Sequence, residues 1–374
     1  MTFQPHTARL FAAALAAAAL AALAPAAPVL AGTFSCTGSA DPLAAASSQP
    51  VRPTSSISGP AVTASRTPDD PWFSRQPEIF SGCWSFDLRG IWGREGDPVV
   101  VATVDSGLDP TQPDLQGAIW TNPGEIPANR VDDDHNGYVD DVHGADMLQR
   151  DTPLDDRYGH GTEVAGLIAA RGDNGVGVAG VAWNAQIMPV RVIGAAGTGT
   201  SADMAEGIRY AADNGARVIN VSLNTSLDTD VLRDALADAA AHDALVVASA
   251  GNDGRDLDVE PSYPAASDSP IVLSVAATGF RGALASFSNH GADTVDVATS
   301  GIDLPTTMTM DRFGLFSGTS ASAAVVSGVA ALLRSAVPGA SAEQVRRAIM
   351  ATALEPGYYD VTAGFVAPAA ALQA

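Results

Sequence analysis

The chain has 374 residues, 46% of them hydrophobic, and its 42 acidic and 20 basic residues give a net charge of −22 at pH 7. This acidity argues against nucleic-acid binding, which needs a basic surface. The length allows two domains, but the first part of the chain has too few large apolar residues to form a core. We therefore expect one domain of about 300 residues.

Residues 1–31 have the features of a signal peptide. Arg9 precedes a long alanine and leucine stretch, which ends at Val29-Leu30-Ala31, where a signal peptidase would cut. The stretch is too short and too rich in alanine for a membrane span, and no later run of about 20 apolar residues follows. We therefore expect a secreted protein, extracellular or periplasmic, that is monomeric and has no membrane contact after signal removal.

Residues 32–68 are predicted to be a flexible segment, because proline, serine and alanine dominate and few large apolar residues could offset the entropy of ordering. Aromatic residues return at Trp72, so we place the folded domain at residues 69–374. The two cysteines, Cys36 and Cys83, both follow the expected cleavage site. In an oxidising compartment we expect them to form a disulfide. Two free, buried thiols are the alternative.

Apolar runs alternate with helical patterns along the folded domain. Residues 99–104 form a β-branched run, which is typical of a strand buried on both faces of a parallel sheet. Similar runs recur at 187–192, 218–222, 245–250 and 271–275, with helical patterns between them at 161–170, 201–214 and 229–241. The alternation predicts an α/β fold of three layers, α/β/α, with a mostly parallel central sheet. Ligands of such sheets bind beyond the carboxyl ends of the strands, where Asp105, Ser222 and Asn252 fall.

Two helix starts are predicted near the C-terminus. Gly318-Thr319-Ser320 precedes an apolar run, so Ser320 would stand in the first turn of a helix. Unpaired N–H groups and the positive end of the helix dipole can stabilise an oxyanion there, which makes Ser320 a candidate nucleophile. By itself such a serine is more often only an N-cap. The capping box Ser341-Ala342-Glu343-Gln344 predicts a last helix that ends at about residue 353.

A nucleophilic serine needs a base, and the base needs a group that fixes its tautomer. His160 is the best candidate base, because glycines flank it at a predicted helix start and leave its ring unobstructed. The other five histidines lie in the signal peptide, in polar loops or near a helix end. Asp105, at the tip of a buried strand, is the candidate orienting carboxylate, although an aspartate there can also simply cap a loop.

Three stretches together resemble the motifs of the subtilisin-like serine proteases. They are, in chain order, Asp105-Ser106-Gly107, His160-Gly161-Thr162-Glu163-Val164-Ala165-Gly166 and Gly318-Thr319-Ser320. The resemblance implies an endopeptidase that hydrolyses peptide or protein substrates through an acyl-enzyme. It implies Asp105, His160 and Ser320 as the catalytic triad, and Asn252 of Ala250-Gly251-Asn252 as the oxyanion donor.

The same resemblance implies where the substrate lies. The substrate backbone would bind as an added strand beside Ser222, Leu223 and Asn224 on one side and Ala250 and Gly251 on the other. It also implies a cis Tyr263–Pro264 bond in a turn beside the primary specificity pocket.

The chain departs from the family pattern in two places. Ala321-Ser322-Ala323-Ala324 stands where the family usually has Met-Ala-x-Pro, and Asn224 stands where it usually has glycine. These changes motivate the alternative of a catalytically impaired protein that keeps the fold and binds peptides. Glu163 and the stretch from Thr319 are also similar to the sedolisins, which use glutamate in place of histidine. The presence of His160 and Asn252 favours the subtilisin-like interpretation.

Two oxygen-rich loops are candidate calcium sites. Asp132, Asp134 and Asn136 alternate around a glycine turn, as in a calcium loop, but the bidentate glutamate expected at the twelfth position is absent. A merely solvated acidic loop is the alternative. The family resemblance implies a second, structural calcium site. Its oxygens would come from the side chains of Asp114 and Asn174 and from the backbone carbonyls of Val176 and Val178.

Overall fold

The computed structural model describes residues 67–76, 88, 92, 96–150, 155–279, 282–354 and 360–372. The description below concerns the unit Ser58–Ala374. The predicted signal peptide, the flexible segment up to residue 66 and both cysteines lie outside the described residues. The predictions made for them therefore stay predictions.

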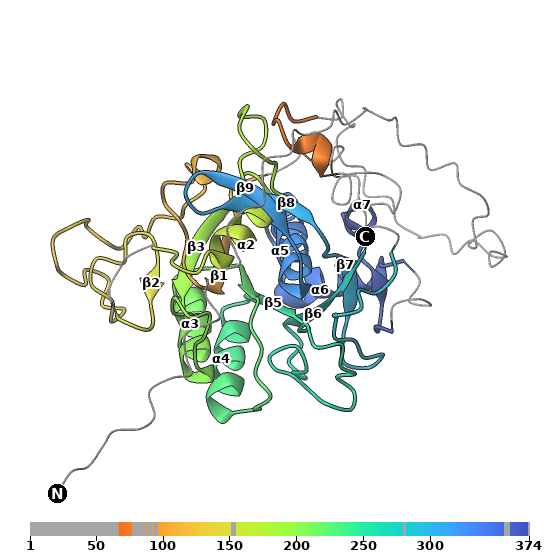
Figure 1. Cartoon of the computed structure of the whole chain (residues 1–374). Coiled ribbons are helices and arrows are strands. Elements are labelled where there is room, and N and C mark those ends of the chain that lie inside the picture. The colour runs from red at the N-terminus through yellow and green to blue at the C-terminus, as the bar shows by residue number, and fades with distance from the viewer. Residues whose placement is uncertain are drawn as a thin grey trace, which may run out of the picture. The chain divides into compact units, whose positions relative to one another are not determined.

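A sheet of eight parallel strands organises the described part of the chain (Figure 1). β1 (Val100–Asp105) lies inside it, between β3 (Gln186–Arg191) and β4 (Val218–Val221). Beyond β4 follow β5 (Leu245–Ser249), β6 (Val272–Thr278), β7 (Val297–Ser300) and β10 (Gly364–Phe365), and β2 (Ala145–Asp146) flanks β3. The predicted parallel sheet is confirmed. Because neighbouring strands run the same way, the carboxyl ends of β1, β4 and β5 meet at one edge.

Helices cover both faces of the sheet, which gives the three layers expected from the sequence (Figure 1). α2 (His160–Ala169) and α5 (Thr319–Ala336) pack against each other and against strands on one face. α3 (Ser201–Asp213) and α4 (Asp230–Ala241) pack together on the other. α6 (Ala342–Ala351) contacts α5 and is followed by the short α7 (Pro368–Ala371).

Local capping signals fix several helix starts. At α6 the Ser341 side chain accepts a hydrogen bond from the Gln344 backbone while the Gln344 side chain accepts one from the Ser341 N–H. This confirms the predicted capping box. Thr200 and Asp203 make the same reciprocal pair at the start of α3. Both boxes satisfy N–H groups that the first helical turn leaves unpaired.

The structure contains strands that the sequence pattern did not predict. These are β2, β7 and β10, and an antiparallel hairpin of β8 (Leu304–Met308) and β9 (Arg312–Phe316). All are short, and Pro305 and Gly314 weaken the strand pattern of the hairpin. β6 runs to Thr278, beyond the predicted end at 275. The sequence did not predict this extension, because alanines 276 and 277 carry little β-propensity. The other predicted elements differ from the observed ones by one or two residues at their ends.

α5 forms the centre of one helical layer. Every residue from Thr319 to Ser335 is buried, and the helix contacts β1, β4, β5, β6 and β7. Among the described helices it is the one with the length and apolar composition of a membrane span, but 94% of that stretch is buried inside the protein. An all-round apolar helix in this position is the core helix of the domain.

Candidate active site

His160 and Asp105 form a hydrogen-bonded pair at the carboxyl end of β1. Asp105 is fully buried, and its two carboxylate oxygens lie 2.8 and 2.9 Å from His160 Nδ1. The Ser106 N–H donates to the same carboxylate at 2.7 Å. Nδ1 of the imidazole therefore carries a proton towards Asp105, and Nε2 remains available to accept another.

The backbone at the start of α2 places this ring. Gly159 precedes the helix with φ of 99°, in the left-handed region that favours glycine. At Gly161 a Cβ atom would lie only 2.1 Å from the Gly107 carbonyl oxygen, so no side chain fits there. The close approach of Gly161 to Gly107 brings the first turn of α2 against the loop that follows β1.

Asp156 ties the same two segments together, and the sequence analysis missed it. One of its carboxylate oxygens accepts hydrogen bonds from Ser106 Oγ at 2.8 Å and from the Gly159 N–H at 2.7 Å. The other accepts from both the backbone N–H and the hydroxyl of Thr162. Asp156 thus caps α2 and anchors the residue beside Asp105. Its position four residues before His160 was the one signal in the sequence.

Asn252 contacts the first residue of α5, directly before Ser320. Gly318, with φ of 146°, leads into the helix, and Ser320 is its second residue, 5% exposed. Asn252 Oδ1 accepts hydrogen bonds from the backbone N–H and the hydroxyl of Thr319, at 2.9 and 3.1 Å. Within the described residues, Asn252 Nδ2 makes no hydrogen bond. The carboxamide is therefore held by its oxygen, and its N–H groups remain free beside Ser320.

The hairpin connects the serine to the histidine. The Phe316 ring, at the end of β9, meets the His160 ring edge-on at a centroid distance of 5.3 Å, and four residues later the chain reaches Ser320. In the part of the chain that the structure describes, no hydrogen bond joins Ser320 Oγ to His160. Catalytic hydrogen bonds of ligand-free enzymes are often long and shorten once the substrate is bound.

Charges around His160 favour its protonated form. Burial lowers the pKa of the imidazole, but the charge and hydrogen bond of Asp105, with the charges of Glu163 and Asp156, raise it above its ordinary value. Glu163 lies on the first turn of α2, and burial raises the pKa of its carboxyl to about 7. The carboxyl at this position is therefore a weaker acid than an exposed glutamate.

The expected substrate-binding residues lie on two adjacent segments. Ser222, Leu223 and Asn224 follow β4, and Ala250 and Gly251 follow β5, which pairs with β4 in parallel. The Asn224 side chain donates to the Ser249 carbonyl at 2.7 Å and so bridges the two segments.

The turn at Tyr263 lies beside the segment that follows β4. Thr225 and Tyr263 exchange two backbone hydrogen bonds, at 2.9 and 2.8 Å. The Tyr263–Pro264 bond is cis, as predicted.

The Asp114 region brings together residues that are far apart in the sequence. Asp114 is fully buried and accepts hydrogen bonds from Asn174 Nδ2 at 2.9 Å and from the Val178 N–H at 2.8 Å. The Val176 N–H donates to Asn174 Oδ1. Asp70, which the sequence analysis did not include, is also buried and accepts from the Asn174 N–H. Burial raises the pKa of Asp114 to about 7, and the nearby charge of Asp70 adds to the shift.

In the acidic loop at residues 132–141, the predicted calcium ligands Asp132 and Asn136 make hydrogen bonds to other groups of the loop. Asp132 accepts the N–H groups of Asn136 and Gly137, so its carboxylate closes the turn. Asn136 directs its Nδ2 towards Asp134 and Asp141 and therefore offers them donors, while its Oδ1 accepts from the Tyr138 N–H. Of the three expected ligands, Asp134 alone joins a group of converging carboxylates, with Glu125 and Asp141.

Comparisons with known proteins place the chain in a family. The model of the subtilase family matches residues 96–367. A thermophilic serine proteinase from Bacillus sp. (strain AK1) is 36% identical over 295 residues, and thermitase from Thermoactinomyces vulgaris is 36% identical over 290 residues. The alignments cover 78% and 77% of this chain, 65% of the Bacillus protein and 91% of thermitase.

A solved structure of a protease from Pseudoalteromonas arctica superimposes with a TM-score of 0.69 at 29% identity. The superposition covers 82% of this chain and 99% of the other. The residues matched by the family model, 96–367, include the three motifs. The chain belongs to the subtilase family, the subtilisin-like serine endopeptidases.

Proposed function

We propose that the chain is an exported serine endopeptidase in which Asp105, His160 and Ser320 form the catalytic triad. The observation that carries this proposal is the buried Asp105–His160 pair. Its Nε2 makes no hydrogen bond within the described residues and lies on the same edge of the sheet as the Ser320 turn. Export rests on the predicted signal peptide at residues 1–31 and on the family. The expected substrates are peptides or proteins.

Each residue then has one role in acyl transfer. Ser320 Oγ attacks the carbonyl carbon of the scissile bond while His160 Nε2 takes the hydroxyl proton. The oxyanion that forms accepts hydrogen bonds from the Ser320 backbone N–H and from Asn252 Nδ2. His160 next gives its proton to the leaving amine, and the acyl-enzyme remains. Water, activated by the same histidine, hydrolyses the ester and returns the proton to Ser320.

The segments that follow β4 and β5 supply the substrate site. Their exposed backbone groups can pair with an extended peptide that adds to the sheet between them. Asn224 already spans the two segments through its hydrogen bond to the Ser249 carbonyl. Its side chain therefore occupies space that a glycine at this position would leave open, and we expect it to restrict the side chain that the site accepts.

A sulfonyl fluoride tests the proposal directly. Such reagents modify a serine only where a neighbouring base activates it, so we expect one covalent adduct, which peptide mapping places on Ser320. His160→Ala should prevent the labelling. A folded, mature protein that takes up no reagent would instead be the catalytically impaired peptide-binding protein.

The pH profile tests the role of His160. Only the neutral imidazole can accept the Ser320 proton, so kcat/KM should rise as His160 loses its own proton. The Asp105 carboxylate raises the pKa of the ring, so the midpoint should lie above the ordinary histidine value of about 6.5. Initial rates across the acid-to-alkaline range measure it. Maximal activity in acid with loss at neutrality would instead indicate a carboxyl base.

We also propose a structural calcium ion at Asp114. Its buried carboxylate has no arginine partner among the described residues, and burial disfavours the ionised form, which a cation would stabilise. Asn174 now donates to this carboxylate, and turning its carboxamide over would present the oxygen instead. The carbonyls of Val176 and Val178 would complete an oxygen ligand set, which calcium prefers. The ion would join the loop after β1 to the loop after α2.

A further inference from the structure

Asn220 is a polar residue in the middle of the sheet. It interrupts the apolar run of β4, which lies between β1 and β5, and it is fully buried. Asparagine is unfavourable in a strand, and a buried carboxamide is costly unless its donors and its acceptor are hydrogen-bonded. The partners of the side chain therefore explain this residue better than its place in the strand does.

The Asn220 carboxamide links the core helix to the expected substrate-binding residues. Its Oδ1 accepts a hydrogen bond from the Ser327 hydroxyl, on α5, at 3.0 Å. Its Nδ2 donates to the Ser222 hydroxyl at 2.9 Å. Ser327 follows Ser320 by about two helical turns, so the two residues lie on the same side of α5. The helix that carries the candidate nucleophile is thus joined through one side chain to the segment after β4.

Side chains hold the segment after β4. Ser222, Leu223 and Asn224 follow the last residue of the strand, and none of the backbone hydrogen bonds of the described turns and loops involves them. Free backbone groups are what an added peptide strand requires. A segment that keeps its backbone free must be positioned by its side chains. Ser222 is tied to Asn220 at one end, and Asn224 is tied to the Ser249 carbonyl at the other.

The hydrogen bonds of Asn220 are selective. Thr103 of β1 pairs with Asn220 in register, and it is also fully buried. Its hydroxyl nevertheless has no hydrogen-bond partner within the described residues. Polar groups buried at the same level of the sheet therefore do not all join the network. The carboxamide bonds to Ser327 and Ser222 and leaves the neighbouring hydroxyl out.

We propose that Asn220 is a positioning residue for the substrate strand. This role rests on the proposed endopeptidase function, since it concerns how the peptide is presented to Ser320. Without the carboxamide, the Ser222 hydroxyl loses its donor and α5 loses its bond to the segment. The segment can then shift relative to the nucleophile, and small misplacements of a reacting group lower rates strongly. Asn220 is buried behind Ser222 and acts through it.

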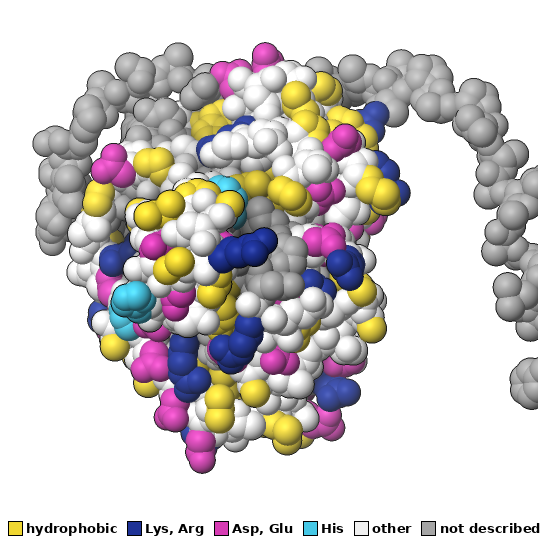
Figure 2. Space-filling view, turned by 90° about the vertical axis from the view of Figure 1, so that its left-hand side faces the viewer, with side chains coloured by type: hydrophobic (Ala, Val, Ile, Leu, Met, Phe, Trp, Pro, Cys, Tyr) yellow, Lys and Arg dark blue, Asp and Glu magenta, His cyan; other side chains and the backbone are white. Residues whose placement is uncertain are grey.

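Substitutions in this network leave the charge and the surface of the protein unchanged. Asn220 and Ser327 are both fully buried, and both are neutral. Figure 2 shows arginine and acidic side chains interspersed on one outer face of the protein. Because the network contains none of these charges, its loss does not alter the attraction of the surface for a charged peptide.

Two substrates of different size test the role of Asn220. A tetrapeptide p-nitroanilide needs the added strand, whereas p-nitrophenyl acetate has no peptide backbone and uses only the triad and the oxyanion donors. Asn220→Val places an apolar side chain in the strand and removes both hydrogen bonds. It should lower kcat/KM for the peptide by about tenfold, the order expected for neutral hydrogen bonds, and leave acetate hydrolysis within about twofold. Ser327→Ala keeps the bond to Ser222 and should give a smaller loss, on the peptide alone.

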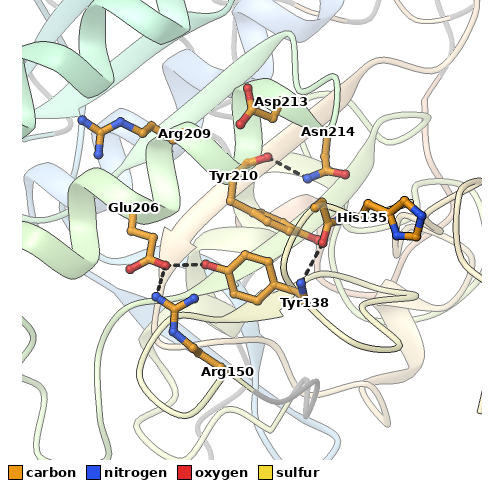
Figure 3. A pocket seen from close by; sticks show the side chains of 9 residues that line it. His135, Tyr138, Arg150, Glu206, Arg209, Tyr210, Asp213 and Asn214 are labelled. Carbon is orange, nitrogen blue, oxygen red and sulfur yellow. Dashed lines mark hydrogen bonds and ion pairs between the residues drawn. The ribbon is translucent and has the colours of Figure 1, made fainter. Parts of the chain in front are cut away.

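Two matched controls separate positioning from a general loosening of the fold. Thr103→Val removes the neighbouring hydroxyl, which has no partner to lose within the described residues. Tyr138→Phe removes the hydrogen bond from the Tyr138 hydroxyl to Glu206 at 2.7 Å, beside the cavity of about 430 Å³ that Figure 3 shows. Glu206 lies on α3, on the opposite face of the sheet from α5. Both controls should keep the parent's ratio of peptide to acetate hydrolysis, even where the melting temperature falls.

The ratio of the two rates distinguishes positioning from stability. Equal losses on both substrates in Asn220→Val would overturn the positioning role, and so would a loss on the peptide as large in either control. If Asn220→Val does not fold, Ser327→Ala carries the comparison, and an unchanged ratio in that variant overturns the role. A parent that hydrolyses neither substrate would instead overturn the proposed function, and this role with it.

Discussion

Ser320→Ala should lower turnover of a peptide substrate by about 10⁶-fold, the loss measured for the nucleophile of subtilisin itself. Without Oγ no acyl-enzyme can form, and only the oxyanion donors and substrate binding still promote direct attack by water. The fold should persist, because Ser320 makes no side-chain hydrogen bond within the described residues. Turnover under saturating substrate, with melting measured in parallel, gives the comparison.

Ser322→Ala is the matched control for this variant. Ser322 lies on the same first turns of α5, but its hydroxyl donates to the buried carbonyls of Thr299 and Ser300. Its loss should cost stability, by about 1 kcal/mol, and leave the chemistry intact. If Ser320→Ala retained activity within tenfold of the parent, Ser320 would not be the nucleophile.

Asn252→Ala should reduce kcat by about 10²–10³-fold with little change in KM, as found for the oxyanion asparagine of subtilisin. The Thr319 N–H and hydroxyl hold Asn252 Oδ1, so Nδ2 is already oriented before the reaction begins. The negative charge appears only in the transition state, and a donor aimed at it therefore acts on kcat. Steady-state kinetics on one peptide substrate separate the two constants.

A second carboxamide provides the comparison for Asn252. Asn224 donates to a carbonyl at the end of β5, on the segment where the substrate would bind. Asn224→Ala should therefore change KM and side-chain preference more than kcat. If Asn252→Ala raised KM and left kcat intact, Asn252 would be a substrate-binding residue and the oxyanion would need another donor.

The sequence was most informative where one residue type has one structural meaning. The β-branched run at 99–104 could hardly be anything other than a buried strand, and Asp105 follows it directly, so both the strand and the position of the acid were predictable. Glycines around His160 and before Ser320 marked helix starts for the same reason. The capping box at Ser341 is entirely local and was also found.

The residues that were missed act through contacts between distant segments. Asp156 looks like any loop aspartate until the fold brings Ser106 to its side. Glu125 lies outside the acidic stretch, and only the folded chain places it against Asp134. The β8–β9 hairpin lacks a clear strand pattern because it is held by its packing on α2, where Thr307 donates to the Thr162 carbonyl. Sequence patterns carry little information about such pairings.

The burial of α5 also bears on how such an enzyme is lost during storage. Ser320 lies on a helix enclosed on all sides, so it belongs to the part of the domain that opens last, whereas surface loops open at much lower free energy. A molecule with an open loop can therefore be cut by a neighbour whose catalytic residues are intact. Loss of the enzyme would then be a bimolecular self-digestion, faster in concentrated solution and slowed by whatever keeps its loops closed.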